Sequence, residues 1–91
     1  MKIKVRLPDS SIQEIEGNLF TGSLDSDSVE IYTGDIIEGN FVNEFGSHTE
    51  SQKKEVFFCQ ENLAFECRDI GKNEEESDHW ILPKNCRVIK K

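Results

Sequence analysis

The sequence predicts an all-β domain, and three observations support that prediction. Short segments with apolar residues at alternating or adjacent positions recur along the 91 residues, a pattern typical of strands. Runs of Ser, Asp, Asn and Gly separate these segments, as turns do. No segment supports a long helix. The length suits one domain, residues 1–91, with a modest core.

The first predicted strand covers residues 2–7. Its side chains alternate between basic and apolar (Lys2, Ile3, Lys4, Val5, Arg6 and Leu7), so one face is expected to be half-buried. A turn that begins at Pro8 ends it. Residues 12–16 fit two structures equally well. They are either a helical turn with a capping box of Ser11 and Glu14 or a short return strand.

The next segments, residues 19–21 and 29–32, flank a run of small polar residues at 25–28. Such side chains bond to their own backbone, so the pattern predicts a hairpin. Gly34 and Asp35 then predict a structural corner before a strand over residues 36–45, which Gly39 interrupts. A catalytic Asp35 is not expected, because no His, Ser or Lys partner lies near it in the sequence.

The clearest predicted hairpin joins residues 55–60 to residues 63–68, with its turn at 61–62. Both faces of its first strand are apolar, which indicates a central or covered strand. Short strands follow at 80–82 and 87–89. Two long polar segments, residues 46–54 and 69–79, have no strand or helix pattern. At this length they are either disordered or functional loops.

Six or seven short strands in a chain of this size predict a small, strongly bent β-barrel of SH3-like or OB-like type with two long polar loops. Closure of the barrel is expected because it protects strand edges that a small open sheet leaves exposed.

One ungapped stretch, residues 20–37, reads FTGSLDSDSVEIYTGDII. It resembles the signature of the YopX-like proteins, a family of small bacteriophage and prophage proteins. The positions in register are Phe20, Thr21, Gly22, Asp25, Glu30, Ile31, Tyr32, Gly34, Asp35, Ile36 and Ile37. The chain departs from the pattern at Ser23, at Ser28 and over residues 82–86. The resemblance implies origin in a phage or related mobile element, and it implies no settled activity.

Charge is distributed unevenly along the chain. The net charge is −7, and all 18 acidic residues lie between Asp9 and Asp78. That interval holds four basic residues and therefore carries a net charge of −14. The other seven basic residues lie near the two ends.

The acidic loops predict a non-catalytic module that binds a host or phage protein. The candidate contact residues are Asp25, Asp27, Glu74, Glu75, Glu76 and Asp78. In the sharper form of this hypothesis, the protein inhibits a nucleic-acid-handling or defence enzyme by imitating phosphate charge, and electrostatic steering speeds the encounter.

The alternative is a nucleic-acid-binding accessory protein. Its candidate residues are Lys2, Lys4, Arg6, Arg87 and Lys90. This hypothesis needs the two terminal strands to be neighbours, so that their charges form one basic patch beside stacking aromatic residues.

Neither catalysis nor a metal site is expected. Cys59, Cys67, Cys86 and His79 are suitable zinc ligands, but no two of them have the close spacing of structural zinc sites. No cofactor is predicted. Three cysteines, no apolar run of membrane-spanning length and no signal-peptide core indicate a protein of the bacterial host cytoplasm. The oligomeric state stays open between monomer and homo-oligomer.

Overall fold

The structure is a computed structural model that describes residues 2–73 and 75–90. Over these residues it contains nine strands and no helix, and hence no helix that could span a membrane. The strands are β1 (Lys2–Arg6), β2 (Ile12–Glu16), β3 (Phe20–Leu24), β4 (Glu30–Tyr32), β5 (Ile36–Gly39), β6 (Gln52–Cys59), β7 (Ala64–Arg68), β8 (Trp80–Ile81) and β9 (Cys86–Lys90). The all-β prediction is confirmed.

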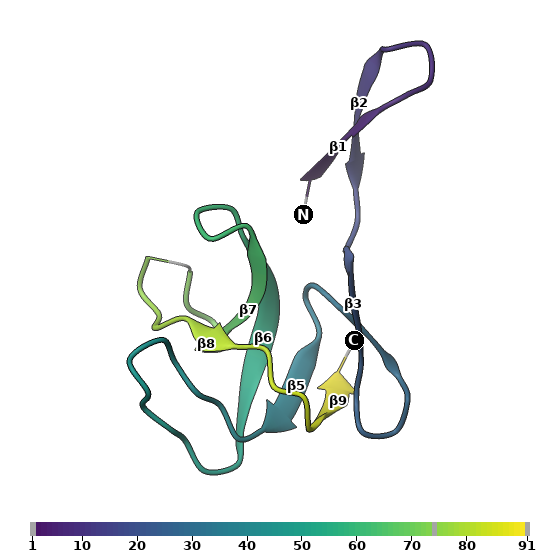
Figure 1. Cartoon of the computed structure of the whole chain (residues 1–91). Coiled ribbons are helices and arrows are strands. Elements are labelled where there is room, and N and C mark those ends of the chain that lie inside the picture. The colour runs from purple at the N-terminus through teal and green to yellow at the C-terminus, as the bar shows by residue number, and fades with distance from the viewer. Residues whose placement is uncertain (1, 74, 91) are drawn as a thin grey trace.

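The strands form three separate antiparallel sheets (Figure 1). Two are the hairpins β1–β2 and β3–β4, and the third has five strands in the order β8-β7-β6-β5-β9. The sheets are open, so the predicted closed barrel is not present. Closure would need β8 and β9 to pair, and β8 has only two residues with which to pair. Both N-terminal hairpins also lie outside the main sheet.

The β1–β2 hairpin projects from the rest of the molecule as an arm (Figure 1). Residues 12–16, which fitted either a helical turn or a strand, form the return strand β2. The turn between the strands is closed by Asp9, whose Oδ1 accepts hydrogen bonds from the backbone N and the Oγ of Ser11. In register, Lys4 lies opposite Glu14 and Ile3 opposite Ile15. The alternation seen in the sequence therefore gives one mainly charged and one mainly apolar face, with Ile12 opposite Arg6 and Gln13 opposite Val5 as the exceptions.

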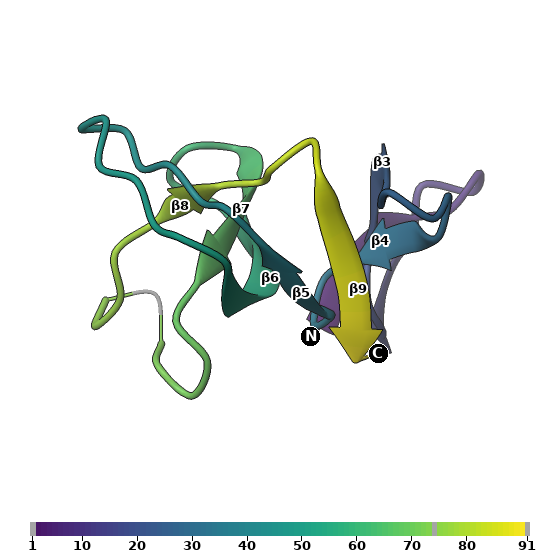
Figure 2. The ribbon, with the colours of Figure 1, turned by 90° about the horizontal axis from the view of Figure 1, so that it is seen from below.

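The core lies against one face of the five-stranded sheet. Its buried members are Ile31, Ile37, Phe41, Val56, Cys67, Trp80 and Cys86, with Leu82 and Val88 packed against them. Ile31 comes from β4, so the β3–β4 hairpin covers part of this face. Seen from below, β9 lies between that hairpin and the rest of the main sheet (Figure 2).

The predicted corner after β4 is confirmed. Gly34 has φ +90°, a left-handed conformation that glycine adopts without steric cost. Asp35 is buried, and its Oδ2 accepts a hydrogen bond from the backbone N of Tyr32 at 2.9 Å. The carbonyl of Asp35 accepts another from the backbone N of Val56. These bonds fix the direction in which β5 enters the main sheet.

The predicted hairpin of β6 and β7 is also confirmed, with Val56 opposite Cys67 and Phe58 opposite Phe65. β6 is the central strand of the main sheet, as its apolar faces predicted. It begins at Gln52, so the preceding loop is shorter than the polar segment 46–54 indicated.

Candidate functional site

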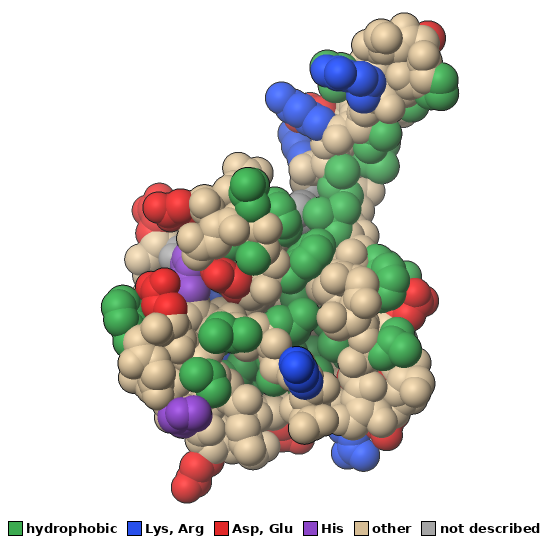
Figure 3. Space-filling view, in the orientation of Figure 1, with side chains coloured by type: hydrophobic (Ala, Val, Ile, Leu, Met, Phe, Trp, Pro, Cys, Tyr) green, Lys and Arg blue, Asp and Glu red, His purple; other side chains and the backbone are tan. Residues whose placement is uncertain are grey.

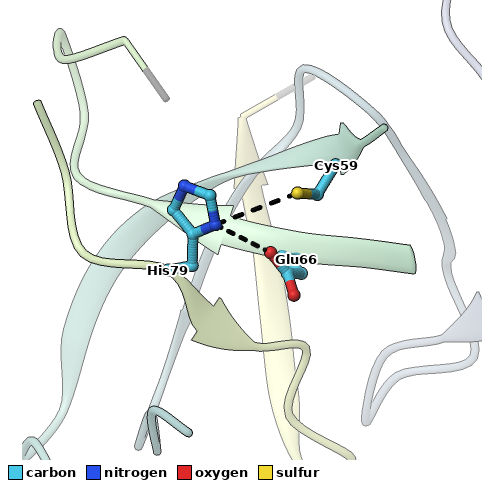
Figure 4. A group of neighbouring side chains, drawn as sticks. All are labelled: Cys59, Glu66 and His79. Atoms are coloured by element: carbon cyan, nitrogen blue, oxygen red, sulfur yellow. Dashed lines mark hydrogen bonds and ion pairs between the residues drawn. The ribbon is translucent and has the colours of Figure 1, made fainter. Parts of the chain in front are cut away.

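Three side chains with metal-ligand chemistry meet beside β6 and β7 (Figure 4). Cys59 and Glu66 alternate with the core residues Val56 and Cys67 along these strands, so they lie on the opposite face of the main sheet. Nδ1 of His79 lies 3.9 Å from Sγ of Cys59 and 3.0 Å from Oε1 of Glu66. One atom from each residue lies within 4.8 Å of the other two. We refer to Cys59, Glu66 and His79 as the Cys-Glu-His cluster.

Strand register brings these residues together. Phe57 pairs with Glu66, and Cys59 pairs with Ala64, so Cys59 and Glu66 point to the same face as diagonal neighbours. Cys67 pairs with Trp80 on β8, which places His79, the preceding residue, next to Glu66. The cluster thus combines the end of β6, the middle of β7 and the residue before β8.

Neighbouring side chains hold the cluster in place. The ring of Phe57 meets the imidazole of His79 edge-on, with centroids 5.2 Å apart. Nδ2 of Asn62, in the β6–β7 turn, donates a hydrogen bond to Oε2 of Glu66 at 3.1 Å. Cys59 is fully buried, whereas the side chain of His79 is 26 % exposed. The cluster is therefore open to solvent on the imidazole side.

The other two cysteines lie in the core. Burial raises the pKa of the Cys67 thiol to about 12, and the nearby Cys86 contributes to that rise. Burial also raises the pKa of Cys86, and the charge of Asp25 adds to it. Both thiols stay protonated at neutral pH, so neither is a reactive or ligating thiolate. The sequence offered Cys59, Cys67, Cys86 and His79 as zinc ligands. The structure brings together only Cys59 and His79 of these four, and Glu66 is the third member of the cluster.

A second feature lies beside the cluster on the outer loops. Glu44, Glu61 and Asp78 come from three different loops and line one shallow hollow, together with Phe45 and His79. The side chain of Phe45 is 84 % exposed. We refer to Glu44, Phe45, Glu61 and Asp78 as the acidic face. Figure 3 shows several acidic side chains at the left of the body, where β8 and the neighbouring loops lie in Figure 1.

Of the acidic residues predicted to contact a partner, Asp25 is in a different environment from the one expected. It is only 6 % exposed. Its Oδ1 accepts hydrogen bonds from the backbone N of Asp27 and of Val29, and its Oδ2 from the backbone N of Val88. These bonds, that from Val88 first, hold the pKa of Asp25 below its usual range. Its carboxylate is occupied within the fold. Asp27 is exposed, and its Oδ2 lies 3.4 Å from Nε of Arg87.

The late acidic loop supplies the other candidates. Glu74 lies outside the described residues. Glu75 and Glu76 are exposed and follow Asn73, whose Oδ1 accepts a hydrogen bond from the backbone N of each. Asp78 belongs to the acidic face. Sequence reasoning missed Glu44 and Glu61. The available signal was an apolar residue close to each in a polar turn segment, Phe45 directly after Glu44 and Leu63 two residues after Glu61, and both apolar side chains are exposed.

The basic residues of the nucleic-acid alternative lie on strands of two separate sheets. Lys2, Lys4 and Arg6 lie on β1, whereas Arg87 and Lys90 lie on β9, which belongs to a different sheet. Lys2 pairs in register with Glu16, and Lys4 with Glu14. The charged face of the arm therefore alternates in sign, which weakens its attraction for a phosphate backbone.

Comparisons with known proteins give no relative: no family model, no curated protein and no solved structure matches this chain. The resemblance of residues 20–37 to the YopX-like signature stays a prediction.

Proposed function

We propose that this chain is a non-catalytic protein-binding module, carried by a phage or related mobile element, that contacts a basic surface of a host or phage protein. The observation that carries the proposal is the acidic face, where three carboxylates from separate loops line the same hollow as an exposed phenylalanine. Protein interfaces are enriched in aromatic residues at their centre and have a polar rim, and a few central residues carry most of the binding energy.

The residues of the acidic face contribute to binding in two different ways. Phe45 supplies the apolar contact that determines how long the complex lasts. Glu44, Glu61 and Asp78 attract a basic partner and accelerate association. The net charge of −7 acts in the same direction at longer range. In its sharper form, the proposal names an enzyme with a basic nucleic-acid channel as the target, because that channel offers the complementary charge.

The test is a pull-down from a bacterial lysate with the tagged protein, with and without nuclease treatment. We expect a stoichiometric protein that survives nuclease and elutes at high salt. Phe45→Ala is expected to weaken its binding by about 2 kcal/mol, roughly thirtyfold in Kd. The double reversal Glu44→Lys/Asp78→Lys is expected to slow association and reduce its salt dependence.

The matched control reverses two exposed carboxylates elsewhere, Glu30→Lys/Glu50→Lys, which changes the net charge equally. If both reversals weaken binding to the same extent, only net charge matters and the acidic face is not the contact. Recovery of nucleic acid alone would instead favour the basic residues of β1 and β9.

A further inference from the structure

We propose that the Cys-Glu-His cluster is a binding site for a single Zn²⁺ ion, with three protein ligands and a fourth position open to solvent. This proposal is independent of the protein-binding function and departs from the sequence expectation that no metal is bound. The ligand atoms are Sγ of Cys59, Oε1 of Glu66 and Nδ1 of His79.

The distances between these atoms suit zinc. Bonds of about 2.3 Å to sulfur and about 2.0–2.1 Å to nitrogen and oxygen, at tetrahedral angles, place sulfur and nitrogen about 3.6 Å apart and nitrogen and oxygen about 3.4 Å apart. The structure has 3.9 Å and 3.0 Å for these two separations. These two separations need to change by only about 0.3–0.4 Å, which small side-chain rotations provide. The third separation, between Sγ of Cys59 and the Glu66 carboxylate, lies within 4.8 Å and shortens to about 3.6 Å when both atoms bind zinc.

The hydrogen bonding of the polar atoms in the cluster also favours a bound cation. Oε1 of Glu66 is buried and accepts no well-oriented hydrogen bond within the described part of the chain, although Nδ1 of His79 lies 3.0 Å away. Sγ of Cys59 points to the same nitrogen. A proton on Nδ1 can serve only one of these acceptors. Without that proton, the Cys59 thiol can donate to Nδ1, and Oε1 of Glu66 is left without a donor. A divalent cation would satisfy all three at once, with the thiol proton of Cys59 released to solvent as sulfur binds the ion.

The surroundings match those of a metal site. Asn62 holds the second carboxylate oxygen of Glu66, the kind of outer contact that orients a metal ligand. Phe57 restrains the imidazole. The hollow that His79 lines carries Glu61 and Asp78 on its rim, so the approach attracts cations and leaves room for a water as the fourth ligand.

The ligand set determines which metal is expected. Thiolate and imidazole favour zinc and similar borderline-soft ions, whereas Ca²⁺ and Mg²⁺ require oxygen ligands throughout. The acidic face alone is therefore not a zinc site, and Cys59 and His79 provide the selectivity.

The test uses the full chain, reduced, freed of any affinity tag and treated with a chelator. It is titrated with Zn²⁺ against a chromophoric chelator, and separately with Co²⁺. We expect one ion per chain and a cobalt spectrum with a thiolate charge-transfer band and the visible bands of tetrahedral coordination. His79→Gln and Cys59→Ser are expected to weaken zinc binding more than a hundredfold, and Cys59→Ser also to abolish the charge-transfer band.

Two further variants separate ligation from folding. Asn62→Ala changes an exposed side chain, so its fold is expected to persist while zinc affinity falls about 10–100-fold. His48→Gln, at an exposed histidine outside the cluster, is expected to bind zinc like the wild type. The proposal is overturned if Co²⁺ gives no thiolate band, or if His79→Gln binds zinc as tightly as His48→Gln.

Discussion

Asp25 ties three parts of the chain together through one carboxylate. Its bonds to the amides of Asp27 and Val29 close the turn between β3 and β4. Its bond to the amide of Val88, 63 residues away, attaches that turn to β9. Because these bonds favour the ionised form, the pKa of Asp25 lies below its ordinary 3.8. The folded protein is therefore more stable when this carboxylate is charged.

The first prediction concerns Asp25→Asn, which removes the charge and keeps the shape. Since the folded pKa is depressed, the stabilisation is fully present above about pH 4 and is lost as the pH falls through the folded pKa. The variant is expected to be less stable than the wild type at pH 7, and the difference is expected to shrink below pH 4. Urea unfolding of both proteins between pH 7 and pH 3 measures this. A difference independent of pH contradicts the assigned role of the charge.

The second prediction concerns Cys67. Its pKa of about 12, against an ordinary value of 9.0, leaves about a thousandfold less thiolate at pH 8. Alkylation by iodoacetamide at pH 8 is therefore expected to be at least that much slower in the folded protein than in urea. Peptide mapping after timed quenching gives the rate at this residue. Equal rates in both states would mean that the core around β7 opens readily.

Lys54 shows how a residue in a polar sequence segment becomes part of the core. Its side chain is only 4 % exposed, its Nζ lies 2.7 Å from Oδ1 of Asp69, and the ammonium lies 4.6 Å from the centroid of the Trp80 ring. The buried charge is thus paired and covered by an aromatic face, which are the conditions under which a buried ammonium is tolerated.

Among the strands, β1 and β2 of the arm receive the least stabilisation from the rest of the structure. They pair only with each other, and an isolated two-stranded hairpin is marginally stable in water. Ile12 and Ile15 are exposed, while Lys2, Lys4 and Arg6 place charges along the strand, which discourages edge-to-edge aggregation. The basic N-terminus therefore has a structural explanation that requires no nucleic acid.

The third prediction follows from this difference in support. The arm is expected to open at a cost near 0–1 kcal/mol, and β6 only with global unfolding at about 5 kcal/mol or more. Amides of Lys4 and Val5 are then expected to exchange with deuterium about a thousandfold faster than those of Val56 and Phe57, after correction for intrinsic rates. Equal protection would show that the arm is held by contacts additional to its own pairing.

The fourth prediction tests the corner that leads into β5. At Gly34 an added Cβ would lie 3.2 Å from Oδ1 of Asn18, and the backbone φ is +90°. Gly34→Ala is therefore expected to destabilise the protein by about 1–2 kcal/mol. Gly22→Ala is a useful comparison, since φ there is also positive but no atom lies within 4 Å of the added Cβ. If Gly22→Ala lowers the free energy of unfolding by less than Gly34→Ala does, the difference measures the crowding against Asn18, because backbone strain is common to both positions.

At the scale of the whole molecule, the arm makes the chain elongated. The radius of gyration of the Cα atoms is 14.1 Å and the principal extents are 48 × 30 × 20 Å, whereas a compact domain of this length has a radius near 12 Å. The fifth prediction is that small-angle X-ray scattering of a dilute sample gives a pair-distance distribution with a long tail towards this long axis. A symmetric distribution of compact shape would mean that the arm folds back onto the body in solution.

Local patterns in the sequence were sufficient for most individual elements. The alternation in residues 2–7, the polar turn at 25–28, the corner at Gly34 and the β6–β7 hairpin were all predicted correctly, because each depends on residues close together in the chain. The helix-or-strand choice at residues 12–16 was open, because five residues satisfy either period. The hydrogen bonds of Asp25 within its own turn could be predicted from the sequence, because they join neighbouring residues. Its bond to Val88 could not, because the two residues are 63 positions apart.

By itself, the sequence determined that this chain is all-β, where its turns lie and how unevenly its charge is distributed. Only the tertiary structure decided that the sheets stay open, that Asp25 and Lys54 are buried, and that Cys59, Glu66 and His79 meet. The physical reason is that strand order and register depend on contacts between distant segments, and no local spacing records them. Cys59 and His79 are 20 residues apart, and only the pairing of β6, β7 and β8 makes them neighbours.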